Sequence, residues 1–164
     1  MFRDMRRSKQ QLAEEESLQI LEDNGWGVLS VHGDEGYPYG IPVNYMFMDG
    51  KIYIHGAKEG HKIDAIAADA KVSFVVVDKD DVVPEEFTTY FRSVVVFGKA
   101  KIMEDSDEIE RVAAILGEKF WPGHMEESKA AAIREKTATG MMVITPEHIT
   151  GKECIELVKK RTAK

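Results

Sequence analysis

Apolar and polar residues repeat with two different periods along this chain, and the period changes several times. Four stretches place apolar residues at the spacing of an amphipathic helix. These predicted helices are residues 12–24, 63–70, 107–120 and 125–136. Ser106 is placed to cap the third of them, and Trp121-Pro122-Gly123 is placed to end it.

The remaining apolar runs have the two-residue alternation or the continuous apolar character of β-strands. They are residues 27–32, 37–48, 51–55, 71–77, 90–103, 140–144 and 147–155. The Asp49-Gly50 pair predicts a tight antiparallel turn between the second and third of these strands. Residues 78–89 are acidic around Pro84, which predicts an exposed loop suited to act as a mobile flap, and the basic tail 159–164 is expected to fray.

Six or seven strands with helices between and after them indicate a mainly β fold of the α+β class. The strands are expected to form a small antiparallel barrel or a strongly bent sheet. The chain has 164 residues without internal repeat, low-complexity tract or linker. We therefore expect residues 1–164 to form a single domain.

The composition argues against several classes of function but assigns none. The net charge of -7 argues against broad nucleic-acid binding, and no stretch approaches the ~18 apolar residues of a membrane span. The first ten residues are basic but lack a following apolar core, so we expect no signal peptide and a cytoplasmic protein. The lone Cys154 and five scattered histidines indicate neither a disulfide nor a metal site.

The most informative segment for chemistry is the glycine-flanked basic turn of residues 56–62. Gly56 and Gly60 allow a ligand to approach the backbone, while Lys58, His61 and Lys62 stand at the start of a predicted helix. Such a turn can hold a phosphate. The alternative is a polar loop whose lysines face solvent.

Two further positions could contact a ligand. Asn44 lies between apolar residues of a strand, so its amide needs a partner, either a heteroaromatic ligand or a neighbouring strand. Arg92-Ser93 opens a valine-rich strand and could bring a guanidinium and a hydroxyl to the rim of the same surface.

Four segments taken together carry a family resemblance. Residues 37–45, 49–57, 60–62 and 92–100 resemble the FMN-binding split barrels related to pyridoxamine 5′-phosphate oxidase, and more narrowly the nitroimidazole-resistance (Nim) branch. The similarity extends over about residues 5–155 in the same order. It implies a split barrel and a symmetric homodimer with two FMN molecules in clefts between the subunits.

The resemblance also implies which residues contact FMN. Lys62, with His61, takes the phosphate-binding place, and His55 matches a histidine of the nitroimidazole-reductase branch that is either a proton donor or only a cofactor contact. Trp121 either stacks on the flavin from a neighbouring subunit or simply packs. The complete set of cofactor-binding candidates is Val43, Asn44, Tyr45, His55, Gly56, Ala57, Lys58, His61, Lys62, Ser93 and Trp121.

The end of the chain departs from the oxidases, since residues 153–158 lack their substrate-phosphate signature, which argues against vitamin B6 oxidation. The expected function is an FMN-dependent oxidoreductase that reduces small electron acceptors, nitroaromatic compounds among them, with His55 as the catalytic candidate. A non-catalytic flavin carrier or redox-sensing protein is the main alternative. Haem or a deazaflavin in the same barrel is a third.

Overall fold

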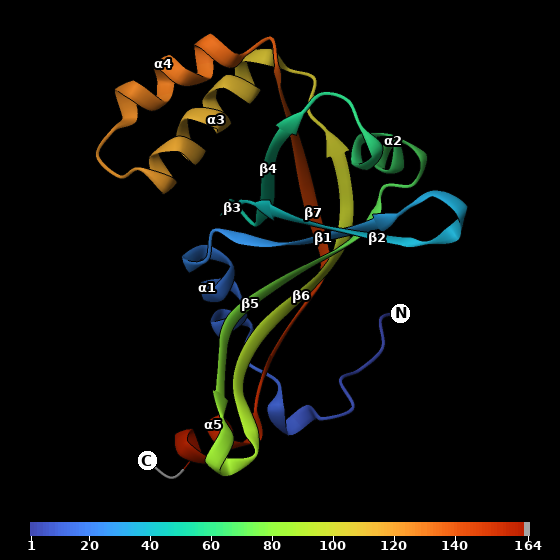
Figure 1. The fold of residues 1–164 in the computed structure, drawn as a ribbon, viewed down its shortest axis with the longest axis vertical. Helices are drawn as coiled ribbons and strands as arrows, with labels where there is room; N and C mark the ends of the chain where they lie inside the picture. Colours follow the sequence, from blue (N-terminus) through green and yellow to red (C-terminus); the bar gives the residue numbers. More distant parts are fainter. Residues whose placement is uncertain (163–164) are drawn as a thin grey trace.

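The computed structural model describes residues 1–162 and contains one antiparallel sheet, wound into the barrel of Figure 1. The order of the strands across the sheet is β2-β1-β5-β6-β7-β4-β3. Their bounds are β1 (Trp26–His32), β2 (Pro38–Asn44), β3 (Met46–Met48), β4 (Lys51–Ala57), β5 (Lys71–Val83), β6 (Thr88–Ile102) and β7 (Thr139–Glu153). The predicted antiparallel split barrel of six to seven strands is confirmed.

The barrel closes through a single chain segment that belongs to both edges of the sheet. β2 and β3 are the two edge strands, yet only Tyr45 separates them in the sequence. Asn44 pairs with Trp26 of β1, and Met46 pairs with Tyr53 of β4. The run predicted as one strand over 37–48 therefore bends at Tyr45 and pairs with a different neighbour on each side of the bend.

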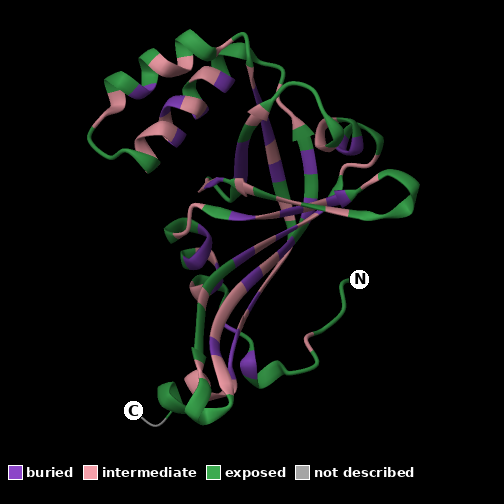
Figure 2. Cartoon of the chain, viewed as in Figure 1, coloured by how far each residue is buried: buried purple, intermediate pink, exposed green. Residues whose placement is uncertain are grey.

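The core fills the interior of this barrel with side chains that alternate along the strands. Figure 2 shows the buried positions following the barrel strands, with more exposed residues along the far ends of β5 and β6. Fully buried members include Leu29, Ile52, Ile54, Phe74, Val76, Val94 and Val96. Gly27 is required here, because a Cβ at this position would lie 2.6 Å from Cζ of Phe74.

Residues 1–162 also form five α-helices and three short 3₁₀ turns. They are α1 (Glu14–Asp23), α2 (His61–Ala68), α3 (Ser106–Phe120), α4 (Met125–Glu135), α5 (Ile155–Thr162), η1 (Ser8–Gln10), η2 (Asp34–Gly36) and η3 (Pro84–Glu86). α3 and α4 form a helical hairpin beside β4, and α2 lies on the other side of that strand's end (Figure 1). No helix among residues 1–162 combines the length and apolar character needed to cross a membrane.

The cap of α3 differs from the prediction by one residue. Asp105, rather than Ser106, is the N-cap: its carboxylate accepts hydrogen bonds from the backbone N–H groups of Asp107 and Glu108 at 2.9 and 3.0 Å. These two hydrogen bonds lower the pKa of the Asp105 carboxyl. The end of α3 at Phe120, before Trp121-Pro122-Gly123, agrees with the prediction.

The prediction of a loop over residues 78–89 is wrong. β5 and β6 continue as a paired ladder to Val83 and Thr88 after a register shift between Val77 and Lys79. The turn itself is only η3 and Phe87, which adopts a left-handed conformation with φ of 50°. Backbone pairing and β-branched residues near the tip outweigh the acidic composition that indicated a loop. The segment is an extended hairpin instead of a flap.

Two features near the C-terminus also differ from the predictions. β7 is one strand instead of two, because a bulge at Glu147 of β7, opposite Phe97 and Gly98 of β6, lets the pairing continue past Pro146, which has no N–H to donate. The tail is helical to Thr162 instead of frayed, since Arg161 lies 2.8 Å from the buried carboxylate of Glu153. Residues 163–164 of the predicted tail lie outside the described residues.

Candidate functional site

Strand β4 presents alternate residues to two different surroundings. Ile52 and Ile54 point into the barrel core, whereas Tyr53 packs under α3 together with Ile109 and Leu116. His55 is exposed on the same outward face as Tyr53, as the two-residue period of a strand requires. Gly56 follows on the opposite face. A single residue step along β4 thus separates two surfaces of the candidate site.

The outward face of β4 borders a cavity of about 380 Å³ between the strands and the α3–α4 hairpin. We refer to it as the α3–α4 cavity. Three predicted residues from distant parts of the sequence line it: Asn44, His55 and Trp121. The other lining residues are Ile109, Glu110, Ala113, Leu116, Gly117, Phe120, Glu127, Ser128, Ala131, Ala132, Glu135, Lys136 and Thr139.

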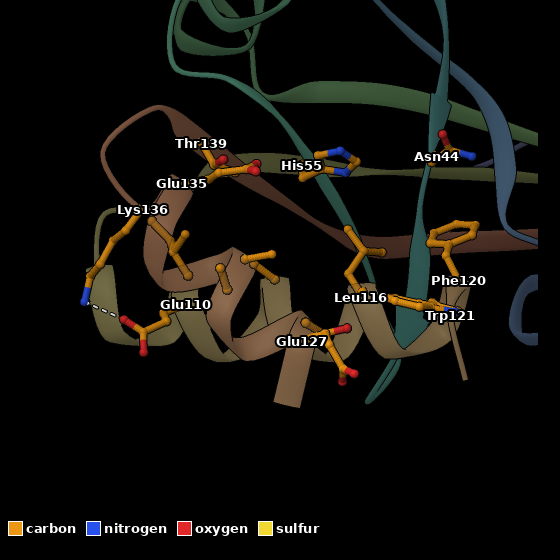
Figure 3. Close-up of a pocket in the computed structure, with 16 residues that line it drawn as sticks. Asn44, His55, Glu110, Leu116, Phe120, Trp121, Glu127, Glu135, Lys136 and Thr139 are labelled. Carbon is orange, nitrogen blue, oxygen red and sulfur yellow. Dashed lines mark hydrogen bonds and ion pairs between the residues drawn. The ribbon is translucent and has the colours of Figure 1, made fainter. Parts of the chain in front are cut away.

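The two ends of the α3–α4 cavity differ in chemistry, as Figure 3 shows. Asn44 lies at the end occupied by Phe120 and Trp121, and His55 lies toward the end occupied by Glu135 and Thr139. One end is therefore aromatic, and the other carries a carboxylate.

Two contacts orient the side chains at the aromatic end. The Asn44 amide Nδ2 donates to the carbonyl oxygen of Gly25 at 3.2 Å. The Trp121 ring stacks on His124, with centroids 3.7 Å apart and an angle of 9° between the planes. These partners reduce the freedom of the amide and the indole before any ligand arrives.

The inward side of the β4 end faces the basic turn. A Cβ at Gly56 would lie 3.3 Å from Cε and 3.4 Å from Nζ of Lys62, so the lysine side chain lies directly over this glycine. Gly60 begins α2 with φ of 122°, a backbone conformation that a residue with a Cβ rarely adopts. The first N–H groups of α2 and the Lys62 ammonium therefore belong to the same short turn.

His61 belongs to the basic turn but is turned toward the β1–β2 connection. Its ring stacks on Tyr39 with a centroid distance of 4.2 Å, and Nε2 lies 3.6 Å from the carboxylate of Asp34. The stacking gives the imidazole a defined position at the start of α2. Asp34 is largely exposed, so its interaction with His61 is weak.

Lys58 links the basic turn to the α3–α4 hairpin. Its ammonium donates to the carbonyl oxygen of Lys136 at 3.3 Å. Ala57 and Lys58 line a second cavity of about 320 Å³, which shares Ile109 and Lys136 with the α3–α4 cavity. The two cavities therefore adjoin between the basic turn and the outward face of β4.

The Lys136 ammonium is held by two carboxylates of α3. It lies 2.8 Å from Glu110 and 3.1 Å from Asp107, and these hydrogen bonds raise the pKa of Lys136. The positive charge of Lys136 therefore faces α3, where the carboxylates of Glu110 and Asp107 offset it.

Three candidates lie elsewhere. Val43 packs against the barrel core, and Tyr45 is fully buried, its hydroxyl donating to the carbonyl oxygen of Leu21 at 2.9 Å. Ser93 pairs in register with Val77 and Lys152 and lines neither of the two cavities. Within one chain, the structure brings Asn44, His55, Ala57, Lys58 and Trp121 to the adjoining cavities, and Gly56, His61 and Lys62 to the basic turn.

The sequence analysis missed the contribution of α3 and α4 to this site. Phe120, Glu135 and Thr139 line the cavity, as do Ala131 and Ala132. The alanines indicated only a good helix former. A signal was nevertheless present, because consecutive small residues on a helix leave room for a ligand when that helix faces a sheet.

Comparison with known proteins assigns the family. A search of curated proteins gave no match. The family model described as pyridoxamine 5′-phosphate oxidase matches residues 13–153. The chain belongs to this family. Its members form a flavin-binding family with the split-barrel fold, and the assignment agrees with the resemblance found in the sequence.

Solved structures of similar proteins share the fold at low sequence identity. A conserved hypothetical protein from Mycobacterium tuberculosis is 21% identical with a TM-score of 0.79, covering 92% of this chain and 90% of its own. A candidate 5-nitroimidazole antibiotic resistance protein from Bacteroides thetaiotaomicron is 19% identical (TM-score 0.69; 87% and 86% covered). A FAD-binding protein from Mesorhizobium loti is 23% identical (TM-score 0.64; 88% and 96% covered).

Proposed function

We propose that this protein is an FMN-dependent oxidoreductase that reduces small electron acceptors, nitroaromatic compounds among them. One observation carries the proposal: in a chain of a flavin-binding family, Asn44, His55 and Trp121 converge on one cavity that adjoins a basic turn. These residues come from β2, β4 and the end of α3. Their convergence supplies polar groups and an aromatic surface for an organic electron acceptor close to the flavin whose phosphate the basic turn would hold.

The basic turn fits the terminal phosphate of FMN. Lys62 lies over Gly56, where the absence of a side chain leaves room for its ammonium, and α2 begins at the same place. A lysine ammonium and unpaired helix N–H groups are established phosphate-binding elements. His61 would add a hydrogen bond beside Lys62, whereas Lys58, whose ammonium donates to the carbonyl oxygen of Lys136, would add only a weaker electrostatic contribution.

The side chains at the cavity would orient the reactants and move a proton. FMN, when bound and reduced, would supply two electrons, and the reduction of a nitro group to a nitroso group and water consumes these two electrons and two protons. Asn44 can hydrogen-bond a heteroaromatic ring edge through its amide, which Gly25 already orients. His55 is exposed to the cavity and is the side chain type suited to donating a proton near neutral pH.

We further propose that two chains form a homodimer with FMN between them. The outer face of the long strands exposes Val77 and Phe97, which are 38% and 40% accessible, and Phe2 stacks over Phe97 and His148 there. Exposed apolar side chains of this kind on a sheet face favour association with a second copy. Ser93 lies on β6 beside this face and would then approach the partner's FMN.

Substitution of His55 tests the catalytic part of the proposal. Purified protein reconstituted with FMN should show flavin absorbance bands, and the reduced holo-protein should be reoxidised by para-nitrobenzyl alcohol under anaerobic conditions. His55→Ala should slow this reoxidation about a hundredfold, the lower range for loss of a general acid, with less than a threefold change in FMN affinity. His32→Ala, at an exposed histidine of β1, is the matched control.

Two results would contradict the proposal in different ways. If His55→Ala weakens FMN binding without slowing reoxidation, His55 is a cofactor contact and not a proton donor. If the wild-type holo-protein is reoxidised no faster than free reduced FMN, the protein binds flavin without acting as this enzyme. Sedimentation of the FMN complex tests the dimer separately, since a monomeric holo-protein excludes the shared cleft.

A further inference from the structure

We propose that the α3–α4 cavity binds a small aromatic molecule bearing a positively charged group, with its ring against Phe120 and Trp121 and its charge toward Glu135. This inference deepens the proposed function, on which it rests in one respect: the bound molecule would be the electron acceptor. The binding itself depends only on residues of this chain, and the size, walls and charge of the cavity support it.

The size and walls of the cavity suit a ligand with one or two rings. Its volume of about 380 Å³ lies near the lower end of the range for small-molecule sites, roughly 300–1,000 Å³. Small side chains on one helix, Ala131 and Ala132, leave the space, while Leu116 and the two aromatic residues provide apolar surface. A flat apolar ring is the group that this end of the cavity accommodates best.

The aromatic end is held in place rather than formed on binding. Trp121 is 55% exposed and Phe120 is 49% exposed, so both rings present surface to a ligand. The stacking of Trp121 on His124 holds the indole in position. A ligand ring that stacks on these side chains restricts their motion little further. The loss of side-chain entropy is therefore small, which favours binding.

The charge of the lining selects against an anion. Three carboxylates line the cavity, from Glu110, Glu127 and Glu135, together with the ammonium of Lys136 and the imidazole of His55. Lys136 is engaged by Glu110 and by Asp107, so it offers little positive charge to a ligand. Because Glu110 and Lys136 pair with each other, the carboxylates that no lining ammonium offsets are those of Glu127 and Glu135, and they favour a cation over an anion in this apolar cavity.

Glu135 is the carboxylate best placed to contact the ligand. In Figure 3 it lies with Thr139 toward the His55 end, whereas Glu127 lies on the opposite side, beyond the helices. Glu135 is 3.0 Å from Arg134, its neighbour in the chain, but the two side chains are 59% and 70% exposed. An exposed pair of this kind is weak, so a ligand cation can compete for the carboxylate.

Three matched nitroaromatic probes test the charge preference by binding alone. They are para-nitrobenzylamine, para-nitrobenzyl alcohol and para-nitrobenzoate, which share a ring and differ in charge. The chain has two tryptophans, so Trp26→Phe leaves Trp121 as the single tryptophan, whose fluorescence can be excited selectively over that of the tyrosines. We expect saturable quenching at low ionic strength, with the amine bound about tenfold more tightly than the carboxylate and the alcohol between them.

Two variants locate the site. Glu135→Gln should reduce the difference between amine and carboxylate to less than threefold, while Glu126→Gln, at a glutamate of α4 paired with Lys129, should leave it unchanged. Ala132→Phe should abolish saturable quenching by all three probes, because the larger side chain occupies the cavity. If Ala132→Phe fails to fold, the two exposed glutamate variants still decide the charge preference.

The outcomes separate this inference from the proposed function. Equal affinities for the three probes, or an unchanged preference in Glu135→Gln, would overturn the inference. A titration with FMN in the Ala132→Phe variant provides the second arm: FMN affinity within threefold of wild type supports an acceptor pocket, whereas loss of FMN binding would make the cavity part of the flavin site and overturn the inference. A wild-type protein that binds the amine but no FMN refutes the proposed function and the acceptor role, while the binding site itself stands.

Discussion

The two faces of β4 lead to surfaces of opposite chemical character. On one side, Gly56 faces the Lys62 ammonium at the start of α2. On the other side, His55 faces a cavity whose far wall is built from apolar side chains and carboxylates of α3 and α4. Successive side chains of a strand point in opposite directions, so one residue step is enough to separate the two surfaces.

The two surfaces lie close together but differ in charge. A small barrel of this kind therefore offers separate binding surfaces to an anionic group and to a neutral or cationic molecule. The positive charge of the basic turn lies at a helix N-terminus, where anions are favoured. The carboxylates of the cavity lie across β4, on the helical hairpin. In the proposed enzyme, the first surface would hold the FMN phosphate and the second the electron acceptor. The following substitutions test this division.

The largest effect is expected from Lys62→Ala. Removing the ammonium should weaken FMN binding about tenfold or more, the loss of at least one charged hydrogen bond, or about 1.4 kcal/mol. Riboflavin, which lacks the phosphate, should bind wild type and variant equally. Fluorescence titration of the flavin measures both affinities.

The control for this prediction is Lys51, an exposed lysine at the end of β4 that lies away from the basic turn. Lys51→Ala removes the same charge at the start of β4 and should leave both flavin affinities unchanged. If Lys62→Ala lowers the affinities for FMN and riboflavin by the same factor, the lysine does not act on the phosphate, and the division between the two faces of β4 fails.

A second substitution tests how the cavity side is built. A Cβ at Gly117 of α3 would lie 2.7 Å from Oγ of Ser128 on α4, so Gly117→Ala forces the two helices apart. Overpacking of this kind costs about 1–3 kcal/mol, partly offset by the ~1 kcal/mol gain in helix propensity, and we expect a net loss of about 1 kcal/mol. Urea unfolding measures the change.

The coupling between the two helices can be isolated with a double mutant. In a Ser128→Gly background the steric conflict is absent, so Gly117→Ala should no longer destabilise the protein. Affinity for FMN phosphate should stay the same in all three variants, because the basic turn lies across β4. An equal loss of stability in both backgrounds would show that Gly117 does not set the approach of α3 to α4.

Tyr45→Phe tests whether a predicted flavin contact is instead part of the barrel. The substitution removes the hydrogen bond to Leu21 and should lower the free energy of unfolding by about 1 kcal/mol, with no change in FMN affinity. Burial raises the pKa of the Tyr45 phenol, and the charges of Asp23 and Asp78 add to the rise. A change in FMN affinity with unchanged stability would place Tyr45 at the flavin after all.

The same shift predicts a dependence on alkaline pH. The folded protein retains the Tyr45 proton at pH values where an unfolded tyrosine, with its pKa of about 10, has lost it. The unfolded state then binds fewer protons, so the free energy of unfolding falls as the pH rises above that value. Tyr45→Phe should show a shallower fall than wild type when unfolding is measured between neutral and alkaline pH.

Much of the barrel could be predicted because its signals are local. The Asp49-Gly50 turn places β3 and β4 antiparallel, and alternation along each strand indicates which side chains point inward. The same alternation places Val43 and Tyr45 on the core side and Asn44 outside, as the structure shows. Val43 and Tyr45 had been grouped as flavin contacts on the family resemblance alone, whereas Asn44 was also a candidate because its strand position leaves an amide in need of a partner.

The features that the sequence analysis missed depend on tertiary pairing. The hairpin beyond Val77 is held by backbone bonds between β5 and β6, which an acidic composition does not reveal. The α3–α4 cavity exists because the helical hairpin stands beside β4, and nothing local in Ala131 or Ala132 indicates which strand the helix faces. The roles of Lys62 and Ser93 toward FMN stay predictions, since they depend on the bound cofactor and a second subunit.

We expect the smallest effect from Lys58→Ala, which tests whether the phosphate-binding part of the basic turn includes Lys58. Lys58 Nζ donates to the carbonyl oxygen of Lys136 at 3.3 Å, on the cavity side, whereas Lys62 lies over Gly56. An exposed charge directed away from the phosphate contributes at most about 1 kcal/mol, so FMN affinity should fall no more than about fivefold. The same flavin titration measures it, with Lys62→Ala as the reference. If Lys58→Ala weakens FMN binding as much as Lys62→Ala does, the phosphate lies between the two lysines, and the basic turn and the cavity then form one continuous site.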